Sequence, residues 1–237
     1  AVNDTPQLPV PTLKYFEEFS FRPDDIVIAT YPKSGSTWSQ EIVPLIVNGG
    51  DLTCLQSPNW DRVPWLEYDP NLEGRPSPRM YATHLQYNMM PPSFFKVINV
   101  MRNPKDVFTS AIHYFEKASY HVNPGPQTKF LYKFLDGKVA YGSWFDHVKS
   151  WLNAEDQEHM MHISYEEMIM VRHLTFLEIP LDNEVIEKIA DRCLFKNMKT
   201  NSSNFSLAPL EINCMSKSEF MRKGEFQQMI HTAYSPI

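Results

Sequence analysis

Asp25-Ile26-Val27-Ile28-Ala29-Thr30-Tyr31-Pro32-Lys33-Ser34-Gly35-Ser36-Thr37-Trp38 is the stretch from which the architecture of the chain can be predicted. Residues 26–30 form a short β-branched apolar run, long enough for one buried strand. A loop of small residues follows at 34–37, and apolar residues then recur at helical spacing over 38–48 until Gly49-Gly50. A strand, a small-residue loop and a helix aim free backbone N–H groups and the positive end of the helix dipole at an anion. We therefore expect a cradle for phosphate or sulfate here.

The side chains of this loop suit an anion as well. Lys33 adds a full positive charge, and Ser34, Ser36 and Thr37 add hydroxyl donors. The nucleoside-triphosphate pattern G-x-x-x-x-G-K-[ST] places lysine after its last glycine, whereas here Lys33 precedes Gly35. The order Y-P-K-S-G-S-T-W instead resembles the cytosolic sulfotransferase family, whose loop holds the 5′-phosphosulfate of 3′-phosphoadenosine 5′-phosphosulfate (PAPS). The alternative is a polar strand–helix turn with no ligand.

Composition narrows the function classes. A length of 237 residues suits one α/β domain, and a net charge of −6 argues against a nucleic-acid-binding surface. Cys54, Cys193 and Cys214 lie far apart and predict no disulfide framework, which fits a reducing compartment. The sequence shows neither a signal peptide nor an apolar run of roughly 18 residues, so we expect a cytoplasmic protein without a membrane partner.

Alternating strands and helices predict the fold class. Further strands are expected at 79–83, 96–101 and 159–164, and helices at 104–115, 130–135, 142–152, 165–177 and 183–194. This order predicts a central parallel sheet flanked by helices on both faces, with a P-loop-like nucleotide-binding core. Ligands bind such sheets beyond the carboxyl ends of the strands. Lys33, His84, Arg102 and Tyr165 each follow one of the expected strands, so we expect them at one edge.

Two later motifs are candidates for a second phosphate. Arg102 stands at a strand end and Ser110 lies eight residues later in the next helix, so both side chains can reach one phosphate. The pattern R-N-P-K-D-x-x-x-S resembles the 3′-phosphate motif of the sulfotransferases; the alternative is an ion pair between Arg102 and Asp106. Arg222-Lys223-Gly224 is a weak signal alone, but it resembles the family's late R-K-G element, which closes over the same phosphate.

His84 is the candidate general base. A neutral imidazole suits removal of a proton from a hydroxyl or amine that attacks sulfur, whereas a lone histidine is often only structural. Thr83-His84-Leu85 resembles the family's K-T-H-L-P element, which implies that His84 is catalytic together with Lys33 and Ser110. Ala82 replaces the lysine of that element, so Lys33 is expected to carry more of the leaving-group stabilisation.

The resemblance also implies contacts with the rest of PAPS and with the acceptor. Trp38, Tyr165 and Phe195 match positions that stack on or edge the purine. Residues 193–198 resemble the family's T-S-F-K-x-M, with Met198 matching and with Cys193 and Leu194 as departures. Phe16 and Tyr114 match acceptor-pocket positions. Tyr114 stands where phenol-preferring members often carry phenylalanine, which predicts a wider or more polar pocket. The predicted cofactor-binding residues are Lys33, Ser34, Gly35, Ser36, Thr37, Trp38, Arg102, Ser110, Tyr165, Phe195, Met198, Arg222, Lys223 and Gly224.

Several stretches of the family pattern are absent. After R-K-G the family continues with G-x-x-G-D-W-K-N, but this chain continues with Glu225-Phe226-Gln227-Gln228. Either these loops are deleted, or the sequence joins segments across residues it does not include; the second is favoured because loss of a cosubstrate lid would expose the site. The family's dimerisation segment lies in this missing stretch, so a homodimer is left open. We expect residues 1–237 to form a single sulfotransferase domain.

The sequence thus predicts a PAPS-dependent sulfotransferase acting on a hydroxyl or amine of a small aromatic or steroid-like acceptor, with the desulfated product 3′-phosphoadenosine 5′-phosphate (PAP) also bound. It contains no H-E-x-x-H or C-x-x-C motif, so no metal site is predicted. One alternative is a catalytically weak or inactive relative that binds PAPS or another ligand, which Ala82 and the absent lid motivate. A nucleotide kinase is another, and it would require Mg²⁺ and a Walker-type lysine.

Overall fold

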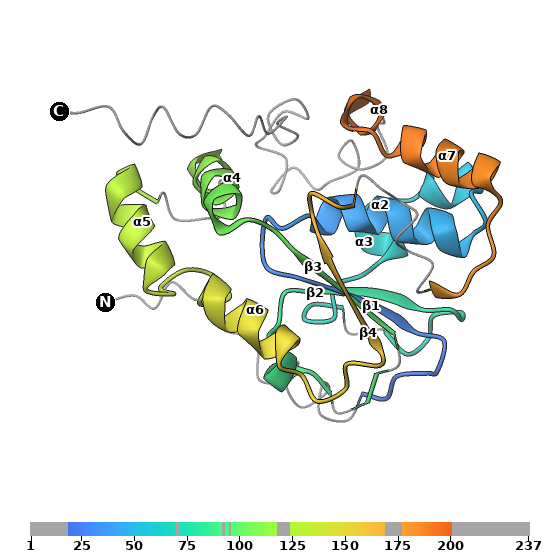
Figure 1. Ribbon diagram of the computed structural model, residues 1–237, viewed down its shortest axis with the longest axis horizontal. Coiled ribbons are helices and arrows are strands. Elements are labelled where there is room, and N and C mark those ends of the chain that lie inside the picture. Colours follow the sequence, from blue (N-terminus) through green and yellow to red (C-terminus); the bar gives the residue numbers. More distant parts are fainter. Residues whose placement is uncertain are drawn as a thin grey trace.

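The computed structural model describes residues 19–69, 72–91, 93–94, 96–117, 124–168 and 177–200. In these residues a four-stranded parallel sheet has the order β2-β1-β3-β4 (Figure 1). The strands are β1 Ile26–Thr30, β2 Met80–Thr83, β3 Val97–Met101 and β4 Met160–Ser164. β1 is an inner strand that pairs with β2 through Ile26 and Met80 and with β3 through Val27 and Val97. The fold class predicted from the sequence is confirmed.

The helices follow the predicted order with shifted ends. They are α2 Ser36–Val47, η1 Leu52–Leu55, α3 Asn59–Arg62, η2 Tyr87–Met89, α4 Pro104–Lys117, α5 Gln127–Leu135, α6 Trp144–Leu152, α7 Asn183–Arg192 and α8 Phe195–Thr200. The helix expected over 165–177 is different: residues 165–168 form a turn, and 169–176 lie outside the described residues. In that described part, no helix has both the length and the apolar character needed to cross a membrane.

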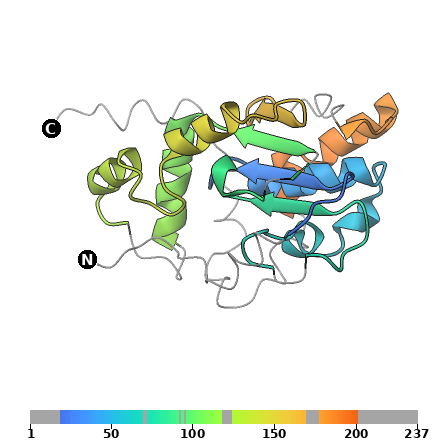
Figure 2. The ribbon, with the colours of Figure 1, turned by 90° about the horizontal axis from the view of Figure 1, so that it is seen from below.

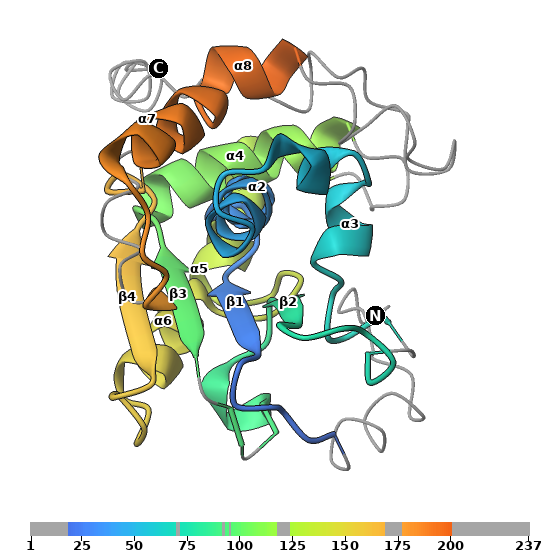
Figure 3. The ribbon, with the colours of Figure 1, turned by 90° about the vertical axis from the view of Figure 1, so that its right-hand side faces the viewer.

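The sheet is buried on both faces, as its apolar strands require. Ile26 and Ile28 of β1 belong to one core cluster with residues of α2 and α7. Val27 and Ala29 belong to a second cluster on the opposite face, which includes Trp151 of α6. This division follows from the alternation of side chains along a strand. Figure 3 shows α2 and α7 on one side of the sheet and α6 toward the other.

A third cluster lies beyond the carboxyl ends of the strands. Val107, Ala111 and Ile112 of α4 pack with Phe130 and Phe134 of α5 and with Tyr31, which comes directly after β1. Figure 2 shows α4 and α5 at this end of the sheet. The Tyr31 hydroxyl donates a hydrogen bond of 2.8 Å to the Gly142 carbonyl oxygen, ahead of α6. These contacts build the wall beside the strand ends.

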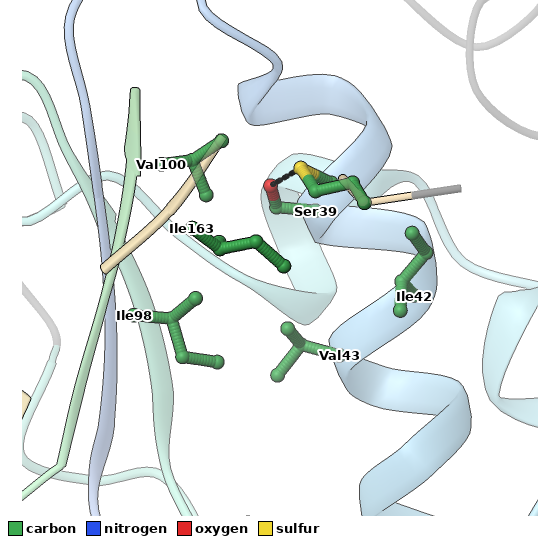
Figure 4. Close-up of a pocket in the computed structure, with 7 residues that line it drawn as sticks. Ser39, Ile42, Val43, Ile98, Val100 and Ile163 are labelled. Carbon is green, nitrogen blue, oxygen red and sulfur yellow. Dashed lines mark hydrogen bonds between the residues drawn. The ribbon is translucent and has the colours of Figure 1, made fainter. Parts of the chain in front are cut away.

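A small apolar cavity lies between α2 and the sheet (Figure 4). Its lining is Ser39, Ile42, Val43, Ile98, Val100, Ile163 and Met168. The Ser39 hydroxyl lies 3.0 Å from the Gly35 carbonyl oxygen and 3.8 Å from the Met168 sulfur, so it has polar partners inside this core. The cavity belongs to the packing that holds the N-terminal end of α2 against the strands.

Candidate active site

The four residues that follow the strands are brought to one edge of the sheet. Arg102 donates a hydrogen bond of 3.0 Å from Nη1 to the Lys33 carbonyl oxygen. The guanidinium carbon of Arg102 lies 4.1 Å from the centre of the Tyr165 ring. Nδ1 of His84 lies 2.6 Å from the carbonyl oxygen of Thr30, the last residue of β1. The two anion pockets expected around Lys33 and Arg102 therefore adjoin each other.

The loop between β1 and α2 has the geometry of an anion cradle. The Ser34 N–H bonds to the Tyr31 carbonyl oxygen at 3.0 Å, which closes the turn. Gly35 occupies the N-cap position of α2, and no side chain caps this helix. The first-turn N–H groups of a helix have no intrahelical acceptor, so they are left to bind an anion. The Ser34 hydroxyl is buried without a hydrogen-bond partner among the described residues.

Tyr165 fixes the shape of this loop. Gly35 has a φ of +121°, and a Cβ atom built on it would lie 2.8 Å from Cδ2 of Tyr165. A glycine is therefore required both by the backbone conformation and by the close approach of the ring. Trp38 packs edge-on against Tyr165, with ring centroids 5.0 Å apart, and its indole N–H donates to the Cys193 carbonyl oxygen at 3.0 Å. Two of the predicted purine-contacting rings thus lie side by side.

Lys33 lies between an aromatic ring and a second cation. Its Nζ is 4.1 Å from the centre of the Tyr114 ring on α4, within the range of a cation–π contact. Burial, together with the Arg102 charge, lowers the pKa of Lys33 to about 8. The residue has a φ of 69°, the left-handed conformation that non-glycine residues rarely adopt. Two cations held next to each other favour an anionic ligand.

His84 is held in one tautomer by the backbone of β1. A carbonyl oxygen can only accept, so the 2.6 Å contact with Thr30 assigns the proton to Nδ1. Nε2 is then the basic atom of the neutral ring. Burial, with the Lys33 charge as a smaller cause, lowers the pKa of His84 to about 4. The imidazole is therefore neutral at pH 7.

Residues that the sequence reading missed surround His84. Trp65 packs against its ring with a centroid distance of 4.3 Å, and Tyr141 contacts the same ring at 5.0 Å. Glu67 accepts a hydrogen bond of 2.6 Å from the His84 backbone N–H. The Tyr141 hydroxyl lies 2.6 Å from that of Tyr68. Glu67 ends the otherwise apolar run V-P-W-L-E, but nothing in that run indicates a contact with His84.

The other predicted site residues lie in α2, α4 and α8 or outside the described residues. Ser36 and Thr37 are half-buried in the first turn of α2, and Ser110 is half-buried in α4. Met198 is buried in α8. Phe195 begins α8, but its side chain is not among the described ones, and Phe16, Arg222, Lys223 and Gly224 lie outside the described residues. In the described part of the chain Arg102 forms no ion pair with Asp106, the alternative considered for it.

Comparison with known proteins identifies the family. The sequence model of the sulfotransferase domain matches residues 23–232. Sulfotransferase 1A1 of Rattus norvegicus is 38% identical over 242 residues, covering 91% of this chain and 83% of the relative. Sulfotransferase 1B1 of Canis lupus familiaris is 40% identical over 229 residues, covering 88% and 77%. The chain belongs to the sulfotransferase family.

Solved structures agree with this membership. A crystal structure of mouse sulfotransferase SULT7A1 complexed with PAP has a TM-score of 0.76 and 29% identity, covering 94% of this chain and 84% of that one. A structure of retinol dehydratase with androsterone and PAP, at 24% identity and a TM-score of 0.79, shares the fold. Sulfotransferases take the sulfuryl group from PAPS. The resemblance, the enzyme class and the sulfate donor predicted from the sequence are therefore confirmed.

The site of this sulfotransferase fits a nucleotide with phosphates at two positions. The uncapped start of α2 and the buried Ser34 hydroxyl provide donors for one phosphate. The Nε atom of Arg102 is also buried without a hydrogen-bond partner among the described residues, which leaves a donor for a second. The Tyr165 ring lies against Gly35 at the start of α2 and against the Arg102 guanidinium, so it offers an aromatic surface next to both phosphate-binding groups.

Proposed function

We propose that this sulfotransferase transfers the sulfuryl group of PAPS to a hydroxyl or amine of a small aromatic or steroid-like acceptor, with His84 as the general base. The observation that carries this proposal is the contact between Nδ1 of His84 and the Thr30 carbonyl oxygen, 2.6 Å long. It fixes the ring in the tautomer whose Nε2 can accept a proton, which is the geometric requirement for a base. We further propose that residues 1–237 form a single domain.

The roles of the charged residues follow from where negative charge develops. PAPS supplies the sulfuryl group, and its nucleotide leaves with an added charge on the 5′-phosphate. The Lys33 ammonium and the N-terminal N–H groups of α2 stabilise this charge, a contribution of about 2.7–4 kcal/mol for each well-placed donor. Ser110 on α4 adds a hydroxyl donor. Arg102 binds the 3′-phosphate, and Trp38 and Tyr165 hold the purine.

Ring-rich surroundings support an aromatic or steroid-like acceptor. Trp65 and Tyr141 both contact the His84 ring. Tyr68, beside Tyr141, is 54% exposed, so an aromatic surface reaches outward from the base. Flat apolar molecules bury well against such rings.

Cytoplasmic location and a homodimer stay predictions.

A catalytically weak or inactive relative is the alternative, favoured by Ala82. This residue is fully buried in the apolar cluster beneath α2, so it supplies none of the positive charge of the lysine that the family carries there. The two proposals differ in one measurement, the transfer of label from [³⁵S]PAPS to a panel of phenols, steroids and amines. Labelled product from wild-type protein, lost in His84→Ala, supports the enzyme. Tight PAP binding without turnover on any acceptor would support the inactive relative.

A further inference from the structure

Residues 64–66 pair with β2, and the turn that follows them brings Glu67 to the base together with Trp65. The Leu66 N–H bonds to the Ala82 carbonyl oxygen, and the Ala82 N–H bonds to the Pro64 carbonyl oxygen, both at 2.9 Å. Trp65 and Ala82 form a parallel bridge. Leu66 packs in the core cluster that includes Val27 and Tyr81, and residues 66–68 form a turn directly after the bridge. Trp65 and Glu67 both contact His84: the Trp65 ring packs against the imidazole, and the Glu67 carboxylate accepts a hydrogen bond from the backbone N–H.

Glu67 is placed in an unusual environment for a carboxyl group. It is 1% exposed, and it forms no ion pair with a lysine or arginine of the described residues. Its Oε1 lies 2.6 Å from the backbone nitrogen of His84. Burial raises the pKa of Glu67 to about 7, and the hydrogen bond from His84 only partly opposes this rise. A buried acid with no cationic partner is costly, and such groups occur most often at functional sites.

We infer that Glu67 is a positioning residue for His84: its carboxyl fixes the backbone of the base, and its negative charge compensates the charge that the imidazole gains. The inference rests on the proposed function of His84. In the transfer step the acceptor O–H or N–H bond breaks and its proton goes to Nε2 of His84. The freed electron pair forms the bond to sulfur, and the electrons of the broken S–O bond leave with the nucleotide. Imidazolium then lies beside Lys33, where an anion is needed.

The other titratable groups around Glu67 change charge elsewhere on the pH scale. Burial raises the pKa of Tyr68 and that of Tyr141, with the Glu67 charge as a further cause in both. Burial lowers the pKa of His147, on α6, to about 3. Lys33 changes charge near pH 8 and His84 near pH 4. Glu67 is therefore the group of this cluster that ionises near pH 7, which gives it a distinct signature in a pH profile.

Glu67→Gln removes the negative charge but keeps the hydrogen bond, because the amide oxygen can still accept from the His84 backbone N–H. We expect kcat at pH 8 to fall by about 10–100-fold, within the range for groups that support proton transfer. The acid limb of kcat near pH 7 should disappear, and the Kd of PAP should stay unchanged. The acceptor is 2-naphthol or a saturated steroid alcohol, whichever the wild-type enzyme sulfates, because neither hydroxyl titrates over the pH range used. Glu67→Asp keeps the charge, so its acid limb should persist and move to lower pH.

Glu41→Gln is the matched control. Glu41 is a second fully buried glutamate, but it forms an ion pair with Arg62 of α3 at 2.7 Å. This variant should unfold at a lower temperature and keep the wild-type pH profile, which distinguishes general destabilisation from an effect on His84.

The outcomes separate this inference from the proposed function. Wild-type kcat and pH profile in Glu67→Gln, together with an inactive His84→Ala, would overturn the role of Glu67 alone. An active His84→Ala would overturn the base itself. If Glu67→Gln fails to bind PAP, the Glu67→Asp profile decides: an acid limb that moves supports the inference, and one that stays at its wild-type position overturns it.

Discussion

Nδ1 of His84 and the carbonyl oxygen of Thr30 are 2.6 Å apart, which ties the candidate base to the end of the central strand. Because β1 also leads into the loop that carries Lys33, one strand positions both the proton acceptor and the anion cradle. The positions of the two groups are therefore both tied to the end of β1. Sites built on strands hold their geometry more precisely than sites on loops.

His84→Ala should remove the proton acceptor without disturbing the nucleotide site. We expect turnover with PAPS to fall by about 10²–10⁴-fold, the usual contribution of a general base. The affinity for PAP, measured by calorimetry, should stay within about twofold of wild type. Normal turnover in this variant would mean that the base has been misassigned.

Activity should decline as the pH rises past about 8. Burial and the Arg102 charge lower the pKa of Lys33 to about 8, so the ammonium loses its proton at and above that pH. Loss of this charge removes stabilisation of the leaving phosphate, and kcat/KM falls. Lys33→Arg keeps a permanent charge and should move the decline to higher pH, even if the guanidinium lowers the rate at pH 7. A wild-type profile that is flat up to pH 10 would contradict this role.

Gly35→Ala tests the loop conformation. The φ of +121° and the 2.8 Å approach to Tyr165 leave no room for a Cβ atom, so we expect a loss of about 1–3 kcal/mol in the free energy of unfolding. PAP affinity should fall at the same time, because the first-turn N–H groups move. Gly74→Ala is the control: a Cβ atom there meets nothing within 4 Å, and its effect should be within about 0.5 kcal/mol. Equal effects of the two substitutions would argue against a strained cradle.

Glu67→Gln should change stability in a pH-dependent way. The pKa of Glu67 is about 7 in the folded chain and 4.5 as an ordinary group, so the folded state binds more protons between these values. Wild-type stability is therefore lost as the pH rises from about 5 to 7, and the neutral variant escapes this loss. In urea unfolding, the free energy of unfolding of Glu67→Gln minus that of wild type should be about 2–3 kcal/mol larger at pH 8 than at pH 4.5. A difference that does not vary with pH would show that Glu67 is already ionised in the folded protein.

Local patterns in the sequence were enough to predict the sheet and the residues at its carboxyl edge. The run 26–30 is apolar and β-branched, and residues 34–37 are small, so the strand, the loop and the helix are each favoured by their own residues. Arg102 and Tyr165 could be predicted at this edge because the carboxyl ends of parallel strands meet there. These features depend on short-range chemistry and on the rules of sheet topology.

The surroundings of the base depend on long-range contacts that no local pattern predicts. Trp65 and Glu67 reach His84 because residues 64–66 pair with β2 and a turn follows, whereas the sequence shows only a proline-rich stretch there. Tyr141 lies in the loop before α6, has a φ of 64° and contacts the His84 ring. Lys33 turns its carbonyl oxygen toward Arg102 through a left-handed conformation, so that the two expected anion pockets adjoin each other. Non-glycine residues in this conformation are stabilised by tertiary contacts, so the sequence gives no sign of them.

The central claim is that the cradle at the start of α2 and Arg102 hold two phosphates of one nucleotide. Calorimetry with PAP and with adenosine 5′-phosphate, on wild type and on Arg102→Ala, tests it directly. Charge-assisted hydrogen bonds contribute about 1.5–3 kcal/mol, so wild type should bind PAP about 10–100-fold more tightly than adenosine 5′-phosphate. Arg102→Ala should remove most of this preference and leave the affinity for adenosine 5′-phosphate nearly unchanged. Equal affinities of wild type for the two nucleotides, or an equal loss of both in Arg102→Ala, would contradict the account.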